Sequence, residues 1–184
     1  MRVLGLAAAL VLAGGLPARA DGDRALSVGI DYATFSAPGI ANSSGQTPSA
    51  ASPSWGAGVS GSYEQALSTD ISLRGELAGD AFSGGLTDPK HQTTRSYAGV
   101  GDVGVLFRFD VLRVVPYAFG GVGGIVATGG PLATTGLVLA IGGGVTFLVD
   151  RRRSVGAEVR IASFGTGLTV VTFGVRLSTR WGQL

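Results

Sequence analysis

The 184-residue sequence contains no cysteine, one histidine and one methionine. The absence of cysteine excludes disulfide bonds, thiol nucleophiles and the cysteine-based metal sites. A single histidine, His91, is too few for the common transition-metal sites. Packing and backbone hydrogen bonds must therefore hold the fold together.

Charge is also scarce, and long apolar runs are missing. Charged residues make up 14% of the chain and hydrophobic residues 45%, with 32 glycines. This composition is too apolar for a small soluble domain with so little charge. After residue 20, however, no run of 18 apolar residues lies free of glycine or proline. A protein that crosses a membrane with helices is therefore disfavoured.

The first twenty residues have the pattern of a cleaved secretory signal. Arg2 is followed by the apolar run 3–16 and by Ala18-Arg19-Ala20, which is a typical cleavage site. As a membrane anchor the run is too short. Cleavage would leave a single domain, residues 21–184, with 12 basic and 12 acidic residues. Because the exported chain would be neutral, nothing in its charge indicates binding to nucleic acid.

The remaining sequence divides into strands. In residues 154–164, Glu158 and Arg160 lie on one face of an extended chain while Val159 and Ile161 lie on the other. Seven further segments are also assigned as strands. The eight expected strands are 25–35, 54–66, 70–82, 96–109, 114–127, 136–149, 154–164 and 168–181.

The connections predict how these strands are arranged. Those after the first, third, fifth and seventh strands are expected to be loops, the longest being 36–53 and 83–95, and the others short turns. Alternation of loops and turns is typical of outer-membrane barrels, whose strands need about nine to eleven residues to cross the bilayer. The sequence therefore predicts an all-β fold, an eight-stranded antiparallel up-and-down transmembrane β-barrel.

The charged face of these strands is expected to line the barrel interior. Balanced acids and arginines, with almost no lysine, suit a closed lumen of ion pairs. An eight-stranded barrel is only wide enough for its own side chains, which favours a filled lumen over an open pore. The predicted lumen charge network is Asp31, Arg74, Glu76, Asp102, Arg108, Glu158, Arg160 and Arg176. Three further charges on the same face are Glu64, Asp80 and Arg180.

The apolar face is expected to meet lipid, with aromatic residues in a girdle at each end. The predicted girdle residues are Trp55, Tyr63, Tyr97, Phe107, Phe109, Tyr117, Phe147 and Trp181. In the fifth strand, this interpretation points Val115, Tyr117, Phe119 and Ile125 outward. It leaves glycines and alanines of the fifth and sixth strands inside, where they would make room for arginines from across the lumen.

One rival interpretation concerns residues 114–149. Their glycines could belong to a membrane-spanning helical hairpin with Arg151, Arg152 and Arg153 beside it. Ten glycines and Pro116 in this segment penalise helix strongly. In the barrel interpretation the three arginines form a periplasmic turn.

The chain resembles the small outer-membrane β-barrel family of Gram-negative bacteria, which includes OmpA-like, OmpX-like and opacity-type barrels. The resemblance lies in S-Y-A-G-V-G-D-V-G-V at 96–105, V-P-Y-A-F-G-G-V-G-G at 115–124 and T-F-G-V-R-L-S-T-R-W at 172–181. The last segment is similar to the family's assembly signal. The resemblance implies a location in the outer membrane, with outer-membrane lipid and the barrel-assembly machinery as partners.

The expected function is non-enzymatic, with a structural or surface-interaction role through the loops. The alternatives are a channel for small solutes or apolar compounds and, third, a lipid-modifying enzyme. A hydrolase needs a nucleophile beside a base, and His91 lies in a loop without such a partner in the sequence pattern. No catalytic, cofactor or metal site is therefore predicted.

Overall fold

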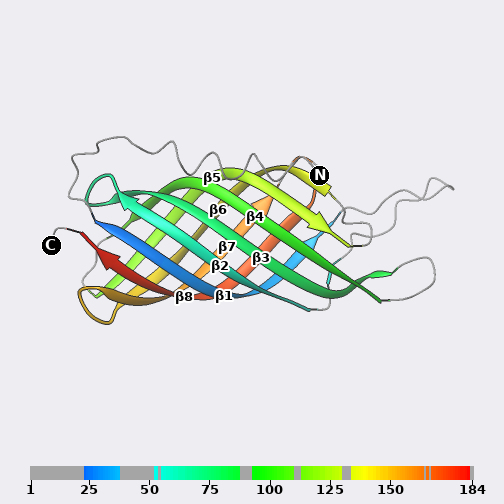
Figure 1. The fold of residues 1–184 in the computed structure, drawn as a ribbon, viewed down its shortest axis with the longest axis horizontal. Coiled ribbons are helices and arrows are strands. Elements are labelled where there is room, and N and C mark those ends of the chain that lie inside the picture. The colour runs from blue at the N-terminus through cyan, green and yellow to red at the C-terminus, as the bar shows by residue number, and fades with distance from the viewer. Residues whose placement is uncertain are drawn as a thin grey trace.

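The computed structural model describes residues 23–37, 52–53, 55–87, 93–109, 113–129, 134–163, 165 and 167–182. Its strands are β1 (Arg24–Ser36), β2 (Trp55–Ala66), β3 (Ile71–Thr87), β4 (Thr93–Arg108), β5 (Val114–Thr128), β6 (Thr134–Leu148), β7 (Arg153–Ser163) and β8 (Thr169–Trp181). They form one closed barrel in which each strand pairs with its sequence neighbours (Figure 1). All pairings are antiparallel, so the predicted eight-stranded barrel is confirmed.

The barrel is closed by pairing of the first and last strands, and we call this contact the seam. It runs without a register shift from the pair Arg24 and Trp181 to the pair Ser36 and Thr169. Closure removes the free edges that an open sheet would expose. The backbone groups of the wall are thereby paired, as a nonpolar surrounding requires.

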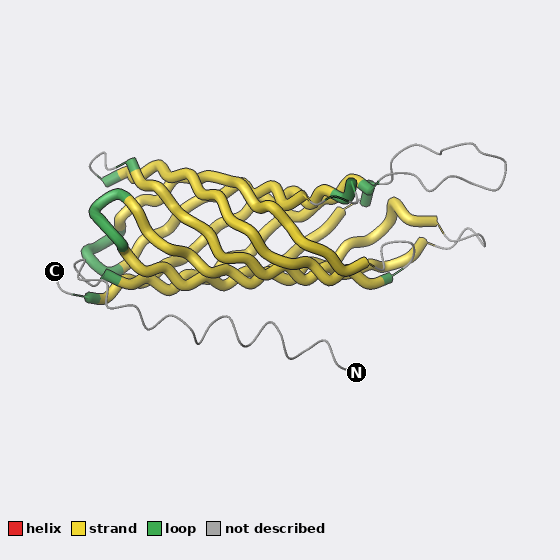
Figure 2. Tube along the Cα trace, turned by 90° about the horizontal axis from the view of Figure 1, so that it is seen from above, coloured by secondary structure: helices red, strands yellow, loops and turns green. Residues whose placement is uncertain are grey.

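The two ends of the barrel differ. We call the end that carries the β2–β3, β4–β5 and β6–β7 connections the turn end. β1 begins there and β8 ends there (Figure 1). The opposite end, which we call the loop end, carries the other four connections, and the elongated barrel lies between the two (Figure 2). In outer-membrane barrels the short turns face the periplasm and the loops face outward.

The predicted lengths of two connections at the loop end are wrong. Residues 83–95 are expected as a loop, but β3 continues to Thr87 and β4 starts at Thr93. Thr87 pairs with Thr93 after a register shift beyond Ser83, so the β3–β4 connection is reduced to residues 88–92. The β5–β6 connection is likewise shorter than expected, at 129–133. His91, residues 1–20 and most of 36–53 lie outside the described residues.

Alternation along the strands gives the barrel an apolar exterior. Leu77 on β3 is 70% exposed and Leu137 on β6 is 85% exposed, whereas Arg74 is only 2% exposed. Such extensive apolar exposure is incompatible with water as the surrounding solvent. A bilayer accounts for it, because lipid-facing residues of a membrane barrel are apolar and alternate with lumen-facing ones. In the described part of the chain, no helix is long and apolar enough to cross a membrane.

The lumen is filled by side chains in two zones. Polar and charged residues occupy the middle and the turn-end half. Phe35 and Phe82 pack edge to face toward the loop end, with ring centroids 5.0 Å apart. Most of the buried apolar residues around them come from the loop-end portions of their strands: Ala33, Ala98, Ile125, Ala127, Val138, Ala140, Ala162, Leu168 and Val170. We call this cluster the apolar plug.

The predicted orientation of β5 is wrong. Val115, Tyr117, Phe119 and Ile125 are all buried inside the barrel, at 1–8% exposure, and Val122 and Val126 face outward. Both faces of β5 consist of apolar residues and glycine, so no charge marks the inner face. The pairing with β4 fixes it, because inward-facing Asp102 lies opposite Gly123 and brings the odd-numbered residues of β5 inside.

Candidate functional site

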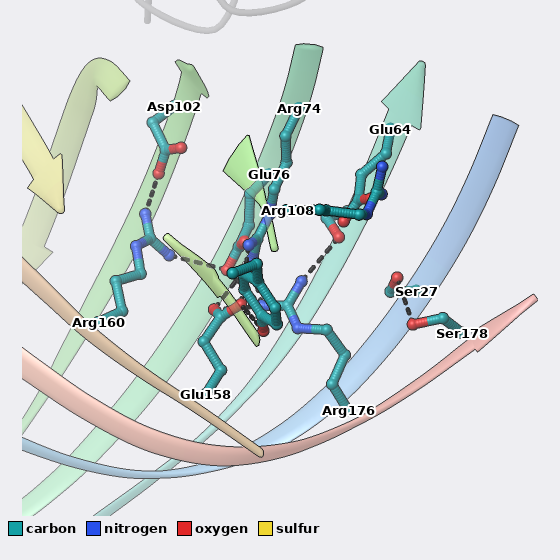
Figure 3. Close-up of polar contacts among 12 residues, drawn as sticks. Ser27, Glu64, Arg74, Glu76, Asp102, Arg108, Glu158, Arg160, Arg176 and Ser178 are labelled. Atoms are coloured by element: carbon teal, nitrogen blue, oxygen red, sulfur yellow. Dashed lines mark hydrogen bonds and ion pairs between the residues drawn. The ribbon is translucent and has the colours of Figure 1, made fainter. Parts of the chain in front are cut away.

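The centre of the lumen is organised around Glu76 on β3. Its carboxylate accepts hydrogen bonds from Arg74 on the same strand, from Arg160 on β7 at 2.9 Å and from Arg176 on β8 at 3.2 Å. Glu76 is 4% exposed and all three arginines are buried. Three guanidinium groups therefore surround one buried carboxylate (Figure 3).

Glu158 on β7 is the second acceptor of the network. Arg74 donates to both of its oxygens, at 2.7 and 2.9 Å, which is the bidentate geometry that an arginine fork favours. Arg176 donates to Oε1 at 2.6 Å. Arg74 and Arg176 thus each contact both glutamates, so the pairs form one connected network that spans the barrel between β3 and β7.

The network extends from Arg160 to β4 and from Arg176 to β2. Arg160 forms an ion pair with Asp102 in addition to its bond to Glu76. Arg176 donates to Ser62 Oγ at 2.7 Å. Six of the eight predicted network residues are therefore joined here, namely Arg74, Glu76, Asp102, Glu158, Arg160 and Arg176.

The remaining two predicted residues lie inward but outside this network. Arg108 forms a separate ion pair with Glu64 and donates to Ser72 Oγ at 2.6 Å, nearer the turn end. Asp31 belongs to none of the ion pairs among the described residues, and its carboxylate occupies the space beside Gly174 on β8. Asp80 lies in the same way against Gly58 on β2. At these two positions glycine makes room for a carboxylate.

Tyr117 and Phe119 belong to the interior site, although Tyr117 is predicted as a girdle residue. The Tyr117 hydroxyl donates to Glu158 at 2.7 Å. Phe119 lies under the Arg74 guanidinium, with 4.5 Å from Cζ to the ring centroid, which is a cation–π contact. Both rings therefore contact the charged centre, although the sequence pattern predicted that they face outward.

Two glycines of β6 make the space for these rings. Gly144 is paired with Tyr117 and Gly142 with Phe119. A Cβ at Gly144 would lie 2.6 Å from the Tyr117 hydroxyl oxygen, and one at Gly142 would lie 2.5 Å from a Phe119 ring carbon. The glycines of β6 therefore accommodate aromatic rings from the neighbouring strand, and not arginines from across the lumen as predicted. The cross-strand match of aromatic residue and glycine is the sequence signal that identifies this feature.

The other predicted girdle residues are exposed on the outer surface. Trp55 and Tyr97 lie toward the loop end, at 56% and 52% exposure. Toward the turn end the Tyr63 and Trp181 rings lie 6.4 Å apart, and Phe107 and Phe109 lie 4.9 Å apart. Phe147 is also exposed at this end, at 48%. An outward-facing aromatic pair that the sequence analysis did not include is Tyr32 and Phe173, paired across the seam.

The chemistry of the lumen favours a structural role for this network. Each of the three carboxylates of the network, Glu76, Asp102 and Glu158, is engaged by at least one arginine, so the charges of the network itself are paired. Among the described residues there is no group of three side chains that could hold a metal ion. The network braces strands on opposite sides of the wall, and the apolar plug fills the lumen beyond it.

No protein-family model matches the chain, and no curated protein sequence matches it. Its structure is similar to Ail of Yersinia pestis, at 16% identity and a TM-score of 0.58, over 88% of this chain and 99% of Ail. Neisserial surface protein A gives 15% identity and a TM-score of 0.63 over 86% and 97% of the two chains. OprG from Pseudomonas aeruginosa gives 8% identity and 0.61 over 88% and 96%. The chain therefore has the fold of the small eight-stranded outer-membrane β-barrels.

Proposed function

We propose that this protein is a non-enzymatic integral outer-membrane barrel that acts at the cell surface through its loop-end connections. The filled lumen is the observation that carries the proposal. Ion pairs link β3, β4, β7 and β8 across the middle, and the apolar plug packs the loop-end half. A barrel whose interior is occupied by its own side chains offers its function on its outside.

The β1–β2 connection is the segment most suited to surface interaction. Residues 37–54 form the longest connection in the chain and contain no charged residue. Loops carried by a rigid scaffold are the usual location of binding functions. A structure of Ail is known in complex with the heparin analogue sucrose octasulfate. An uncharged segment suits a neutral partner better than a sulfated one.

Exchange of this connection tests the surface role. We expect cells whose protein has residues 38–50 replaced by a short Gly-Ser linker to lose adhesion to cultured epithelial cells, compared with cells making the unmodified protein. The barrel itself should persist, because the replaced residues lie outside β1 and β2, and heat-modifiable migration on gels checks this. A matched replacement of residues 130–132 in the β5–β6 connection is the control. Unchanged adhesion with a folded barrel would refute the role of the β1–β2 connection.

A channel for apolar compounds is a second candidate, favoured by the apolar lining of the loop-end half of the lumen. A closed barrel should give no signal in either of two transport assays. We expect no stepwise conductance in planar bilayers and no faster uptake of an apolar dye by vesicles that contain the protein. Empty vesicles and vesicles with a general porin are the controls. Reproducible conductance or dye uptake would favour the channel instead.

The same proposal includes export of the protein and its assembly in the outer membrane. Residues 1–20 would direct export, and the C-terminal strand β8 would be recognised by the barrel-assembly machinery before insertion into outer-membrane lipid. Support comes from the outward apolar face of β8, where Phe173, Val175 and Leu177 are 49–58% exposed.

A further inference from the structure

The arginines of the barrel are distributed very unevenly. Of the eleven that follow residue 20, five lie in the lumen and one, Arg95, lies on the outer surface near the loop end. The other five are exposed at the turn end. We call these five the arginine rim: Arg24, Arg113, Arg151, Arg152 and Arg153.

Hydrogen bonds connect most of the rim into one surface. The β6–β7 turn carries three consecutive arginines, and the Arg152 carbonyl accepts a bond from the backbone N–H of Arg180 on β8, at 2.7 Å. On the other side, the Arg113 carbonyl accepts from the N–H of Leu148 at 3.0 Å. Arg24 begins β1 opposite Trp181. The rim therefore follows the turn end from β5 through β8 to β1.

The described carboxylates at this end are fewer than the rim arginines, and Asp110 in the β4–β5 connection lies outside the described residues, so the excess of positive charge is concentrated in the β6–β7 turn. Asp150 directs its carboxylate back to the turn, where it accepts the backbone N–H groups of Arg152 and Arg153, both at 2.7 Å. These bonds lower the pKa of Asp150, so it remains charged while satisfying the turn. Asp70 lies in the β2–β3 turn on the opposite side of the barrel, and Asp23 precedes Arg24. Among the described residues of this end, none of the rim guanidiniums forms an ion pair with these carboxylates.

Exposed apolar and aromatic residues beside the arginine rim indicate how deep it lies in a bilayer. Phe147 and Val149 are 48% and 70% exposed and immediately precede the arginine turn. Val114 follows Arg113, and Trp181 pairs with Arg24, again with apolar side chains exposed beside arginine. Tryptophan and other aromatic residues of membrane barrels lie at the level of the lipid headgroups. The arginines are therefore at the depth of the lipid phosphates.

We propose that the arginine rim binds the phosphate groups of anionic phospholipids and gathers these lipids around the turn end of the barrel. Guanidinium groups match phosphate oxygens in bidentate geometry. Each basic residue near an anionic surface strengthens attraction by an amount equivalent to about fivefold in affinity. Several arginines on one arc should select phosphatidylglycerol over phosphatidylcholine, and the loop end should not.

The two tryptophans of the chain allow each end to be measured separately. Trp181 lies outward at the turn end and Trp55 outward toward the loop end. Protein purified from membranes as Trp55→Phe or Trp181→Phe is placed in vesicles that contain brominated phosphatidylglycerol or brominated phosphatidylcholine, which quench nearby indole fluorescence. We expect brominated phosphatidylglycerol to be preferred about fivefold or more at Trp181 and to show no preference at Trp55. The preference should fall as salt is raised from 0.05 to about 0.5 M, because exposed charges are screened.

Two variants in the Trp55→Phe background isolate the arginines. Replacement of Arg151, Arg152 and Arg153 by glutamine should lower the preference at Trp181 to the part that Arg24 and Arg113 contribute. Arg95→Gln, which removes the arginine near the loop end, should leave it unchanged. The salt titration of the unmodified rim provides the same test should the triple variant not fold. Equal quenching by the two lipids at Trp181, equal preference at both tryptophans, or an undiminished preference in the folded triple variant would overturn the proposal.

Discussion

Replacement of Glu76 by alanine is expected to lower the free energy of unfolding by about 3–5 kcal/mol. The change leaves Arg160 without one of its two acceptors and removes one glutamate from both Arg74 and Arg176. These guanidiniums are buried, so the lost partner is not replaced by bulk water. Urea titration of the protein folded in phospholipid vesicles, followed by tryptophan fluorescence and by heat-modifiable migration, measures the loss.

The matched control is Asp70→Ala, which removes an exposed carboxylate from the β2–β3 turn. It should change stability by less than about 0.5 kcal/mol. A Glu76→Ala barrel that is as stable as the control would show that the network contributes nothing to the folded state. Removal of Glu64, whose ion pair with Arg108 is less buried, should cost less than removal of Glu76.

The second large effect is expected from Gly142→Val on β6. A side chain at this position points into the lumen and meets the Phe119 ring and the Val159 carbonyl. Overpacking of this kind costs about 1–3 kcal/mol. It should also displace Phe119 from its place 4.5 Å below the Arg74 guanidinium. The same urea titration measures the destabilisation.

Gly120→Val on β5 is the control for this substitution. Gly120 faces outward, and a Cβ there would have no heavy atom within 4 Å. The barrel should tolerate it, because valine suits a strand that faces lipid. The double variant Gly142→Val with Phe119→Leu should recover part of the loss. Equal stability of Gly142→Val and Gly120→Val would contradict the assignment of Gly142 to the inner face.

The sequence was sufficient to assign strands whose faces are marked by charge. In β7, Glu158 and Arg160 identify the lumen, and Arg176 does the same in β8, so the orientation of both strands followed directly. β5 carries no such mark, and a tyrosine there suits either a girdle or a lumen. The pairing of Tyr117 with Gly144 decides between them, and it becomes visible only when the two strands are read together.

The partners within the network were beyond the reach of the sequence. Glu76 on β3 meets Arg160 on β7 because closure places non-neighbouring strands across the lumen. Alternation determines which face a residue occupies but not its height or its opposite partner, since these depend on the stagger of the strands. The β3–β4 loop was overestimated for a related reason. Ser83, Gly84 and Gly85 have turn composition, but pairing with the partner strand extends β3 through them to Thr87.

Opening of the seam between β1 and β8 would disturb the charged network of the lumen. Arg176 on β8 reaches Glu76 on β3 and Ser62 on β2, which lie on the other side of the seam. Parting the two strands would draw this arginine away from Glu76 and Ser62, while Glu158 on the neighbouring strand β7 would stay with it. Opening of the seam would therefore break contacts in the middle of the lumen, which favours a closed wall. Docking of the last strand during assembly is also the step that brings Arg176 to Glu76 and Ser62.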